Sequence, residues 1–272
     1  MTKTVLITGA STGIGLATAK RFQQQGWNVV ATMRSPQKTS DLTTLDNTLS
    51  LQLDVTDSDS IAQAVTTALV EKFSTIDVLV NNAGYALLGA FEACTPEQIE
   101  RQFATNVFGL MAVTRAVLPH FRERQSGTII NIASIGGKMA FPLYSLYHST
   151  KWAVEGFSDS LRYELEPFNI RVKIIEPGPI KTDFYGRSTD PATRPGLTAY
   201  DAFVAKVLPK LKQAGDSGSL PEVTAEVIYQ AATDSSQRLR YPAGGNAGLL
   251  LLLRKLLPDR IFSTIVRSST IG

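Results

Sequence analysis

Residues 3–15 read KTVLITGASTGIG and join a short apolar run to a glycine-rich turn. The run from 3 to 8 is typical of a buried strand, and residues 14–25 carry apolar side chains at helical spacing up to Gly26. Glycines at the turn would let a bound group approach the backbone, and the N–H groups that begin the helix attract a pyrophosphate. A plain strand-to-helix turn would use the same glycines, so this segment alone leaves both interpretations open.

The alternation of strand and helix continues along the chain. We expect further strands at 28–32, 49–55, 76–84, 127–134 and 170–178, and helices at 58–73, 96–121 and 145–166. Thr95, Pro96 and Gln98 make a good start for the second of these helices, because they fit a capping box. Short strands separated by helices predict a parallel sheet. Between 179 and 220 the alternation gives way to a polar segment with one amphipathic stretch near 198–213, and loops of this length are usually functional or mobile.

The composition is that of an ordinary globular protein. Of the 272 residues 43% are hydrophobic and 19% are charged, which disfavours disorder and a disulfide-stapled miniprotein and leaves one or two domains open. The net charge of +3 is too small and too dispersed to predict nucleic-acid binding. Cys94 is the single cysteine, so no intramolecular disulfide can form, and the first residues lack a signal-peptide pattern. We therefore expect a cytoplasmic protein.

The longest apolar run is AGLLLLL at 247–253, inside a Leu-rich C-terminal segment of about 247–266. A transmembrane helix needs about 20 apolar residues, so this run is too short to span a bilayer. The segment could form a lid, a subunit contact or a patch for a membrane surface. A fourth use, which we favour over these three, is the packing of a terminal helix into the core.

Several short motifs follow one another in order along the chain. Gly9, Gly13 and Gly15 have the spacing Gly-x-x-x-Gly-x-Gly, and NNAG stands at 81–84. The others are Asp54 in LDVTD, Asn106 in TNVFG, Ser134 in NIAS, Tyr147 and Lys151 in YHSTK, and Pro177 and Gly178 followed by Thr182. Together these motifs, from residue 4 to about 182, resemble the short-chain dehydrogenase/reductase family, and the pattern is similar to its 17β-hydroxysteroid and retinol dehydrogenase-like branch. The resemblance implies an α/β protein with one domain over 1–272, a doubly wound Rossmann fold with a mostly parallel sheet of about seven strands flanked by helices.

The resemblance also implies a nicotinamide dinucleotide bound at the ends of successive strands. The expected cofactor-binding residues are Gly9, Ser11, Thr12, Gly13, Ile14, Gly15, Arg34, Asp54, Val55, Asn82, Ala83, Gly84, Tyr147, Lys151, Pro177, Gly178, Ile180 and Thr182. An acidic residue after the second strand would bind the ribose of NAD, but Met33 stands there and Arg34 follows. A guanidinium can bind a 2′-phosphate through two hydrogen bonds, so we expect NADP(H) to be preferred over NAD(H), with Ser35 and Lys38 as possible assistants. Arg34 could instead be a solvated surface residue, and Asp54, which the resemblance places beside the adenine, could serve a turn.

Tyr147 and Lys151 lie four residues apart and therefore on one face of a helix. A neighbouring ammonium favours the phenolate of a tyrosine, so Tyr147 can take a proton from an alcohol or return one to an alkoxide. Ser134 ends a predicted strand, where its hydroxyl can hold the substrate oxygen. The resemblance implies that Lys151 also binds the ribose and that Asn106 orders a water linking Lys151 to solvent. Taken singly these residues could be packing or capping groups. We expect no role for His148, and no metal.

Residues 134–147 and the segment of about 179–220 flank the catalytic positions, so we expect them to form the substrate pocket. The expected substrate-binding residues are Ser134, Met139, Phe141, Tyr144, Tyr147 and Phe184, and Leu143 and Tyr185 should complete the walls. Apolar walls favour a lipophilic alcohol or ketone, although core packing would also account for these side chains. We therefore predict an NADP(H)-dependent oxidoreductase that interconverts a carbonyl and a primary or secondary alcohol on a lipophilic small molecule.

Two other functions stay open on the sequence alone. The chain could be a non-catalytic NADP-binding sensor or scaffold protein, although the complete set of catalytic positions argues against this. It could also be a non-redox epimerase or lyase on the same fold. The resemblance further implies a homodimer or homotetramer built on the two long helices from about 96 and 145.

Overall fold

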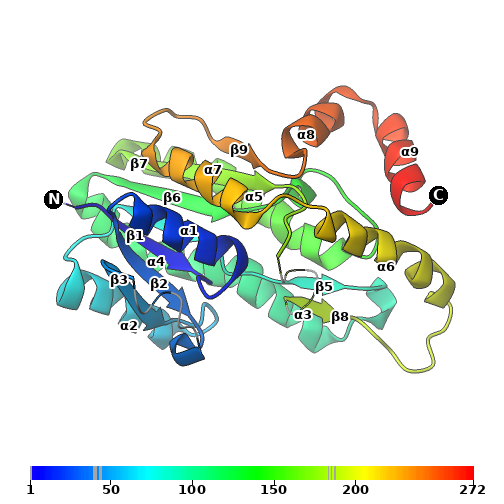
Figure 1. Cartoon of the computed structure of the whole chain (residues 1–272), viewed down its shortest axis with the longest axis horizontal. Helices are drawn as coiled ribbons and strands as arrows, with labels where there is room; N and C mark the ends of the chain where they lie inside the picture. Colours follow the sequence, from blue (N-terminus) through cyan, green and yellow to red (C-terminus); the bar gives the residue numbers. More distant parts are fainter. Residues whose placement is uncertain (1, 39–41, 43–44, 183, 185, 187) are drawn as a thin grey trace.

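A seven-stranded sheet forms the centre of the protein in the computed structural model, which describes the chain apart from residues 1, 39–41, 43–44, 183, 185 and 187 (Figure 1). Its strands are β1 (Thr4–Thr8), β2 (Asn28–Met33), β3 (Thr48–Gln52), β4 (Val78–Asn81), β6 (Gly127–Ile132), β7 (Ile170–Pro177) and β9 (Arg240–Ala243). Their order is β3-β2-β1-β4-β6-β7-β9, and all of these pairings are parallel. The order reverses between β1 and β4, which confirms the doubly wound fold and opens a crevice at the C-terminal ends of the strands.

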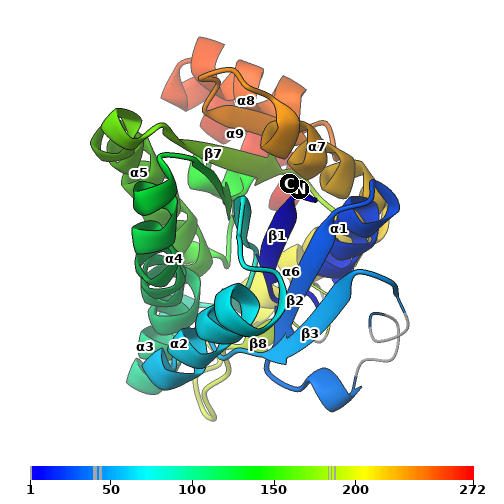
Figure 2. The same ribbon diagram turned by 90° about the vertical axis from the view of Figure 1, so that its left-hand side faces the viewer.

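Helices cover both faces of the sheet (Figure 2). α1 (Gly13–Gln24) and α7 (Pro221–Thr233) contact each other on one face, and α2 (Ser58–Thr66), α4 (Leu110–Arg124) and α5 (Ser145–Leu165) cover the other. The alternation of side chains along a strand divides the core in two. Val5 and Ile7 of β1 belong to the cluster that holds Phe22 of α1, whereas Leu6 belongs to the cluster that holds Val113 of α4. β1 is buried throughout, as expected for a central parallel strand.

The predicted long helices exist, but two of them contain a π-helical turn. The stretch expected at 96–121 consists of α3 (Pro96–Phe103), η4 (Ala104–Gly109) and α4, and the stretch at 58–73 consists of α2 and η2 (Thr67–Lys72). The capping box of α3 is present, since Thr95 Oγ1 accepts from the N–H of Gln98 at 3.2 Å and Gln98 Oε1 accepts from the N–H of Thr95 at 3.1 Å. π-turns often mark functional sites, and η4 holds Asn106.

Some short elements were not expected. β5 (Ala86–Leu88) pairs in parallel with β8 (Thr189–Pro191) in a separate two-stranded sheet, so β8 gives structure to the segment of about 179–220.

The expected amphipathic stretch near 198–213 corresponds to α6 (Asp201–Asp216). The remaining elements are η1 (Pro36–Lys38), η3 (Phe91–Ala93), η5 (Ile135–Gly137), η6 (Glu166–Phe168), α8 (Ala247–Leu256) and α9 (Asp259–Thr270). In the described part of the chain, no helix is long and apolar enough to cross a membrane.

The Leu-rich segment does not pack into the core as we expected. Leu249, Leu252 and Leu256 of α8 are 58%, 51% and 67% exposed. Only the opposite side of α8 packs inward, where Leu250 and Leu251 contact the small cluster that contains Met139. The expectation of core packing is therefore wrong for half of the helix, because helical periodicity does not tell which apolar residues of a uniformly apolar run face inward.

Candidate active site

A large cavity of ≈ 1400 Å³ opens at the C-terminal edge of the sheet. It brings together most of the expected site, since its lining includes Gly9, Ser11, Thr12, Gly13, Ile14, Arg34, Asp54, Val55, Asn82, Ala83, Gly84, Ser134, Phe141, Tyr144, Tyr147, Lys151, Pro177, Gly178, Ile180, Thr182 and Phe184. Four expected residues, Gly15, Asn106, Met139 and Leu143, lie in the structure around the cavity rather than in its lining. Met139 is 1% exposed and belongs to a core cluster, while Tyr185 falls outside the described residues.

The glycine-rich turn is packed so closely that larger residues do not fit. Gly9 has a φ of +67°, and a Cβ there would lie 2.9 Å from the Cα of Ala83. A Cβ on Gly15 would lie 2.3 Å from the carbonyl oxygen of Gly9. Asn82 braces the turn by donating to the carbonyl oxygens of Thr8 at 2.9 Å and Gly9 at 3.0 Å. The turn therefore holds the start of α1 in a fixed position.

The N-terminus of α1 points its backbone donors at the cavity wall. Its N-cap, Thr12, makes no side-chain capping bond, and Thr12, Gly13 and Ile14 line the cavity. Because the first N–H groups of a helix have no partner within the helix, they suit a bound phosphate. The residues present thus fit the pyrophosphate of a dinucleotide.

The ends of β2 and β3 form the next part of the wall. Met33 is buried, whereas Arg34 and Ser35 are exposed, and all three line the cavity. Lys38 ends η1, and its side chain falls outside what the structure describes. The carboxylate of Asp54 accepts from the N–H and the hydroxyl of Thr56 at 2.9 and 2.7 Å, so Asp54 forms a turn while it also faces the cavity.

Tyr147 and Lys151 lie on the inner side of α5, and both are buried. Lys151 Nζ lies 5.7 Å from the centre of the Tyr147 ring and donates a hydrogen bond to the carbonyl oxygen of Ile132 at 2.7 Å. Burial lowers the pKa of Lys151 to about 8, because a charged ammonium is costly away from water. Ser134 follows β6, and its Oγ accepts from the N–H of Gly136 at 3.0 Å. The three side chains face one cavity.

Asn106 is placed by the π-turn η4 between the segment after β4 and α5. Its Nδ2 donates to the carbonyl oxygen of Tyr85 at 2.9 Å and to Thr150 Oγ1 at 3.1 Å, and its Oδ1 accepts from the N–H of Tyr85 at 3.1 Å. These bonds tie the segment after β4 to α5, the helix that carries Tyr147. The geometry shows Asn106 as a brace between the two sides of the cavity.

His148 has a structural place that the sequence did not reveal. It is 6% exposed, and its Nδ1 accepts a hydrogen bond from the N–H of Phe141 at 3.3 Å, a role open only to an unprotonated nitrogen. Burial lowers its pKa to about 4, so the ring is neutral at ordinary pH. Its ring centre lies 5.8 Å from that of Tyr147 and 5.4 Å from that of Tyr144. His148 thus supports the aromatic wall beside Tyr147.

The substrate side of the cavity is aromatic and aliphatic. The Phe184 ring centre lies 5.5 Å from that of Tyr147, and the Tyr144 ring centre lies 5.7 Å from it. Leu143 and Leu211 join these residues in one cluster, so the wall combines residues from 134–147 with residues from α6. Apolar surface at this position favours an apolar ligand.

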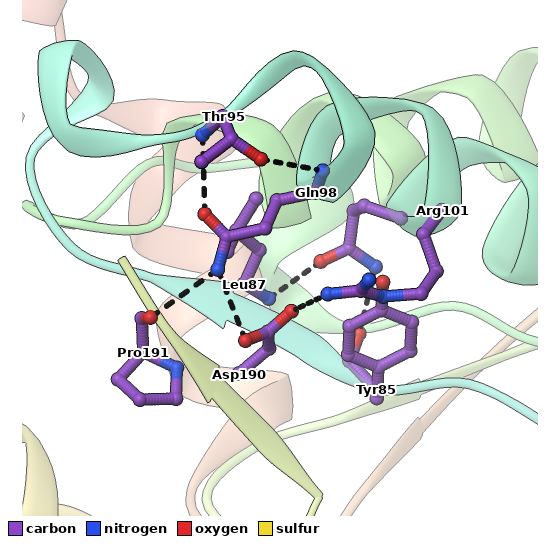
Figure 3. A network of polar contacts seen from close by, with 8 residues as sticks. Tyr85, Leu87, Thr95, Gln98, Arg101, Asp190 and Pro191 are labelled. Carbon is purple, nitrogen blue, oxygen red and sulfur yellow. Dashed lines mark hydrogen bonds and ion pairs between the residues drawn. The ribbon is translucent and has the colours of Figure 1, made fainter. Parts of the chain in front are cut away.

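A polar network anchors the segment with β8 to α3, far from it in sequence (Figure 3). The carboxylate of Asp190 accepts from the guanidinium of Arg101 and from Gln98 Nε2, the latter at 3.1 Å. Gln98 also donates to the carbonyl oxygen of Pro191 at 3.3 Å, so the capping-box residue of α3 has a second role. Arg101, Asp190 and Tyr85 line the cavity. Nothing in the sequence pairs residues 101 and 190, which are 89 positions apart.

The opposite corner of the cavity is closed by a backbone contact between β7 and the turn before α8. A Cβ on Gly178 would lie 2.7 Å from the carbonyl oxygen of Gly245, and a Cβ on Gly245 would lie 2.6 Å from the ring of Pro179. Gly244, Gly245 and Asn246 have positive φ values of 59°, 50° and 57°. This three-residue left-handed turn leads directly from the cofactor side of the cavity into α8.

Comparisons with known proteins agree with this geometry. The family model described as short chain dehydrogenase matches residues 3–192. An uncharacterized oxidoreductase of Schizosaccharomyces pombe is 44% identical over 85% of this chain and 96% of its own length. The 3-ketodihydrosphingosine reductase of Bacteroides thetaiotaomicron is 35% identical over 97% of this chain and 96% of its own. Retinol dehydrogenase 8 of Bos taurus is 34% identical over 98% of this chain and 89% of its own.

Solved structures give the same result. A short-chain dehydrogenase from Streptomyces avermitilis is similar with a TM-score of 0.82 and 34% identity, over 98% of this chain and 96% of that one. The closed form of serine dehydrogenase complexed with NADP+ is similar with a TM-score of 0.73 and 32% identity, over 88% and 94%. A nicotinamide cofactor and chemistry at a CH–OH group follow from this kinship. The chain belongs to the short-chain dehydrogenase family and is an oxidoreductase.

Proposed function

We propose that the protein interconverts a carbonyl and an alcohol on a lipophilic small molecule with NADP(H), and that Tyr147 is the acid/base. One observation carries this proposal: Tyr147, Lys151 and Ser134 face the same cavity from two elements, beside an aromatic wall. When bound, the nicotinamide supplies or accepts the hydride. The residues that would hold it are Pro177, Gly178, Ile180 and Thr182, which line the cavity after β7.

The protein's own side chains would carry out the proton transfer. Ser134 Oγ accepts from a backbone N–H, so its own hydroxyl proton can be donated to the substrate oxygen and stabilise charge there. Lys151, with a pKa of about 8, is mostly charged at neutral pH. Its ammonium therefore favours loss of the phenol proton of Tyr147 to the forming alkoxide during reduction. In the oxidative direction Tyr147 takes that proton back.

NADP(H) is the proposed cofactor because the cavity lacks the acid that would select NAD. At the end of β2 it is lined by Met33 and Arg34, and an exposed guanidinium there suits a 2′-phosphate. Relatives do not settle the choice: serine dehydrogenase was solved with NADP+, whereas a 3-ketoacyl-(acyl-carrier-protein) reductase from Brucella melitensis, 29% identical, was solved with NADH.

The oligomeric state is part of the same proposal. Three exposed aromatic residues, Phe108, Trp152 and Tyr163, lie on η4 and α5 with 63%, 50% and 63% of their surface open. Exposed aromatic side chains are typical of subunit interfaces. We therefore expect a homodimer or homotetramer through the long helices. A cytoplasmic location is proposed on another ground, because a single cysteine suits a reducing compartment. Trp152→Glu should lower the molar mass in solution, measured by light scattering.

The function is tested by turnover with NADPH. Steroid, retinoid, aromatic and aliphatic carbonyl compounds are supplied, and loss of absorbance in the reduced nicotinamide band is followed for the natural protein and for Tyr147→Phe. We expect the variant to lose about 10²–10⁴-fold in kcat, the range for a general acid, with nearly unchanged NADPH binding. Tyr229→Phe on α7 is the control. Full activity in Tyr147→Phe would contradict the mechanism, and product formation without a change in nicotinamide absorbance would favour an epimerase or lyase.

A further inference from the structure

The outer side of the two C-terminal helices is apolar and exposed. Leu249, Leu252 and Leu256 of α8 are spaced for one helical stripe, and all are more than half exposed. Ile261 and Ile265 of α9 are 51% and 44% exposed and are four residues apart. Figures 1 and 2 show α8 and α9 together at one edge of the molecule, beyond β9. We call these five side chains the C-terminal apolar face.

The inner side of the same helices is firmly packed. Phe262 of α9 is 7% exposed and shares a cluster with Ile135 and Met139, against which Leu250 and Leu251 of α8 also pack. The guanidinium of Arg254 lies 5.4 Å from the centre of the Phe262 ring and forms an ion pair with Asp259 at 2.7 Å. The body of the protein therefore fixes the orientation of both helices, and the side chains of the C-terminal apolar face remain exposed on each of them.

The C-terminal segment carries a net positive charge. Residues 247–272 hold four of the 27 basic residues and one of the 24 acidic residues. The segment thus carries +3, the whole formal charge, and residues 1–246 balance with 23 of each sign. Lys255, Arg260 and Arg267 are exposed, and no ion pair among the described residues engages them.

Apolar side chains flanked by exposed basic residues have the chemistry of an interfacial helix. We propose that the C-terminal apolar face binds the surface of an anionic lipid bilayer, with its leucine and isoleucine side chains in the acyl boundary and Lys255, Arg260 and Arg267 at the headgroups. Each basic residue near an anionic leaflet strengthens binding by about fivefold. The three together give more than a tenfold preference for anionic over neutral lipid.

A second copy of the chain is a poorer occupant for this face. A two-fold symmetric contact would bring the same surface of both copies together, so the exposed basic residues of both copies would gather at one interface, with Asp259 as the single acidic residue of the segment in each copy. The exposed aromatic residues expected to join subunits lie elsewhere, on η4 and α5.

The bilayer would lie next to the entrance of the active site. Leu250 of α8 lines the cavity from one side of the helix, and Ser269 and Thr270 line it from α9. A lipid-soluble substrate could then enter the cavity from the membrane surface without passing through bulk water. This last step rests on the proposed lipophilic substrate, whereas binding to the bilayer does not.

The test is vesicle binding by the whole protein, measured by co-sedimentation. Vesicles of phosphatidylcholine alone are compared with vesicles containing about one third phosphatidylglycerol, at low and high salt. We expect binding to the anionic vesicles to be at least tenfold stronger and to weaken with salt, because the attraction is screened. Absent binding, or equal binding to both vesicles, would overturn the proposal.

Two variants locate the surface. Leu249→Ser/Leu252→Ser/Leu256→Ser should abolish vesicle binding, and Lys255→Glu/Arg260→Glu should weaken it by about tenfold or more. The controls change as many exposed residues elsewhere and should bind normally; they are Val70→Ser/Phe91→Ser/Val223→Ser and Lys72→Glu/Lys206→Glu. NADPH binding checks that each variant is folded.

Two results would contradict the assignment of the face. If the serine variant keeps its vesicle affinity, the bilayer binds elsewhere. If the variant changes the molar mass of the protein in solution instead, the face is covered by a second copy. Because vesicle binding is measured without substrate, failure here is distinct from failure of the proposed carbonyl chemistry.

Discussion

The cofactor side and the substrate side of the cavity are built in different ways. On the cofactor side the closest contacts are between backbone atoms. A Cβ added at Gly15 would lie 2.3 Å from the carbonyl oxygen of Gly9. On the substrate side β8 is attached to α3 by polar side chains near the surface, chiefly the exposed Arg101 and the partly buried Asp190. Close backbone contacts allow little adjustment, whereas side-chain contacts at a surface can be exchanged at small cost. We therefore expect the cofactor side to tolerate almost no substitution, and we expect substrate specificity to reside on the substrate side.

The sharpest test of this comparison is Gly15→Ala. The new methyl group must displace the turn that Asn82 braces, so we expect a loss of about 2–3 kcal/mol in stability, the usual cost of overpacking, and loss of NADPH binding. Thermal unfolding and fluorescence titration with NADPH measure both. Gly156→Ala is the control, because a Cβ at that exposed helical position meets nothing within 4 Å. A Gly15→Ala protein that binds NADPH normally would remove the basis of the comparison.

Arg34→Ala tests whether the choice between NADP and NAD is also made on the cofactor side of the cavity. Removing a charged pair of hydrogen bonds to a 2′-phosphate costs about 1.5–3 kcal/mol, so the ratio of kcat/KM for NADP over NAD should fall by about 10- to 100-fold. Arg122→Ala, which removes an exposed arginine on α4, should leave the ratio unchanged. An unchanged ratio in Arg34→Ala would assign the selection to another residue.

The pH dependence of reduction reports on Lys151. Burial lowers its pKa to about 8, so the ammonium that supports Tyr147 is present below that pH and is lost above it. We expect kcat/KM for carbonyl reduction to fall about tenfold per pH unit above the pKa. His148, with a pKa of about 4, is neutral throughout and should not contribute. In Lys151→Arg, whose guanidinium stays charged, the fall should move to higher pH; a fall that stays near pH 8 would assign it to another group.

Asp190→Asn should have the smallest effect and should act on the substrate alone. An exposed ion pair contributes at most about 1 kcal/mol, so KM for the carbonyl substrate should rise about three- to fivefold while kcat and NADPH affinity stay the same. Asp216→Asn, at the exposed end of α6, is the matched control. If NADPH affinity fell as much as substrate affinity, the two sides of the cavity would not be independent.

The sequence predicted the parts that depend on local pattern. The glycine spacing, the alternation of strand and helix and the four-residue spacing of Tyr147 and Lys151 follow from backbone geometry, and the fold they predicted is confirmed. The π-turn at Asn106 was not predicted, because its residues differ little from those of an ordinary helix. β5 and β8 have three residues each, too few for a periodic signal.

Contacts between residues that are far apart in the sequence could not be predicted. The pair of Arg101 and Asp190 depends on the position of β8 against α3, which no local pattern encodes. The burial of His148 beside Phe141 likewise depends on the loop before α5. The exposure of Leu249, Leu252 and Leu256 was missed because every residue from 249 to 253 is leucine, so the inner and outer sides of the helix look alike in sequence.

The left-handed turn at Gly244 to Asn246 joins two regions that would otherwise be remote. Gly245 lies against Gly178 and Pro179 at the cofactor side of the cavity, and two residues later α8 begins at Ala247. Binding equilibria at two sites of one molecule are reciprocal. If attachment of α8 to a bilayer alters the affinity for NADPH by some factor, NADPH must alter the affinity for the bilayer by the same factor. The redox state of the cofactor pool would then influence where in the cell the enzyme resides.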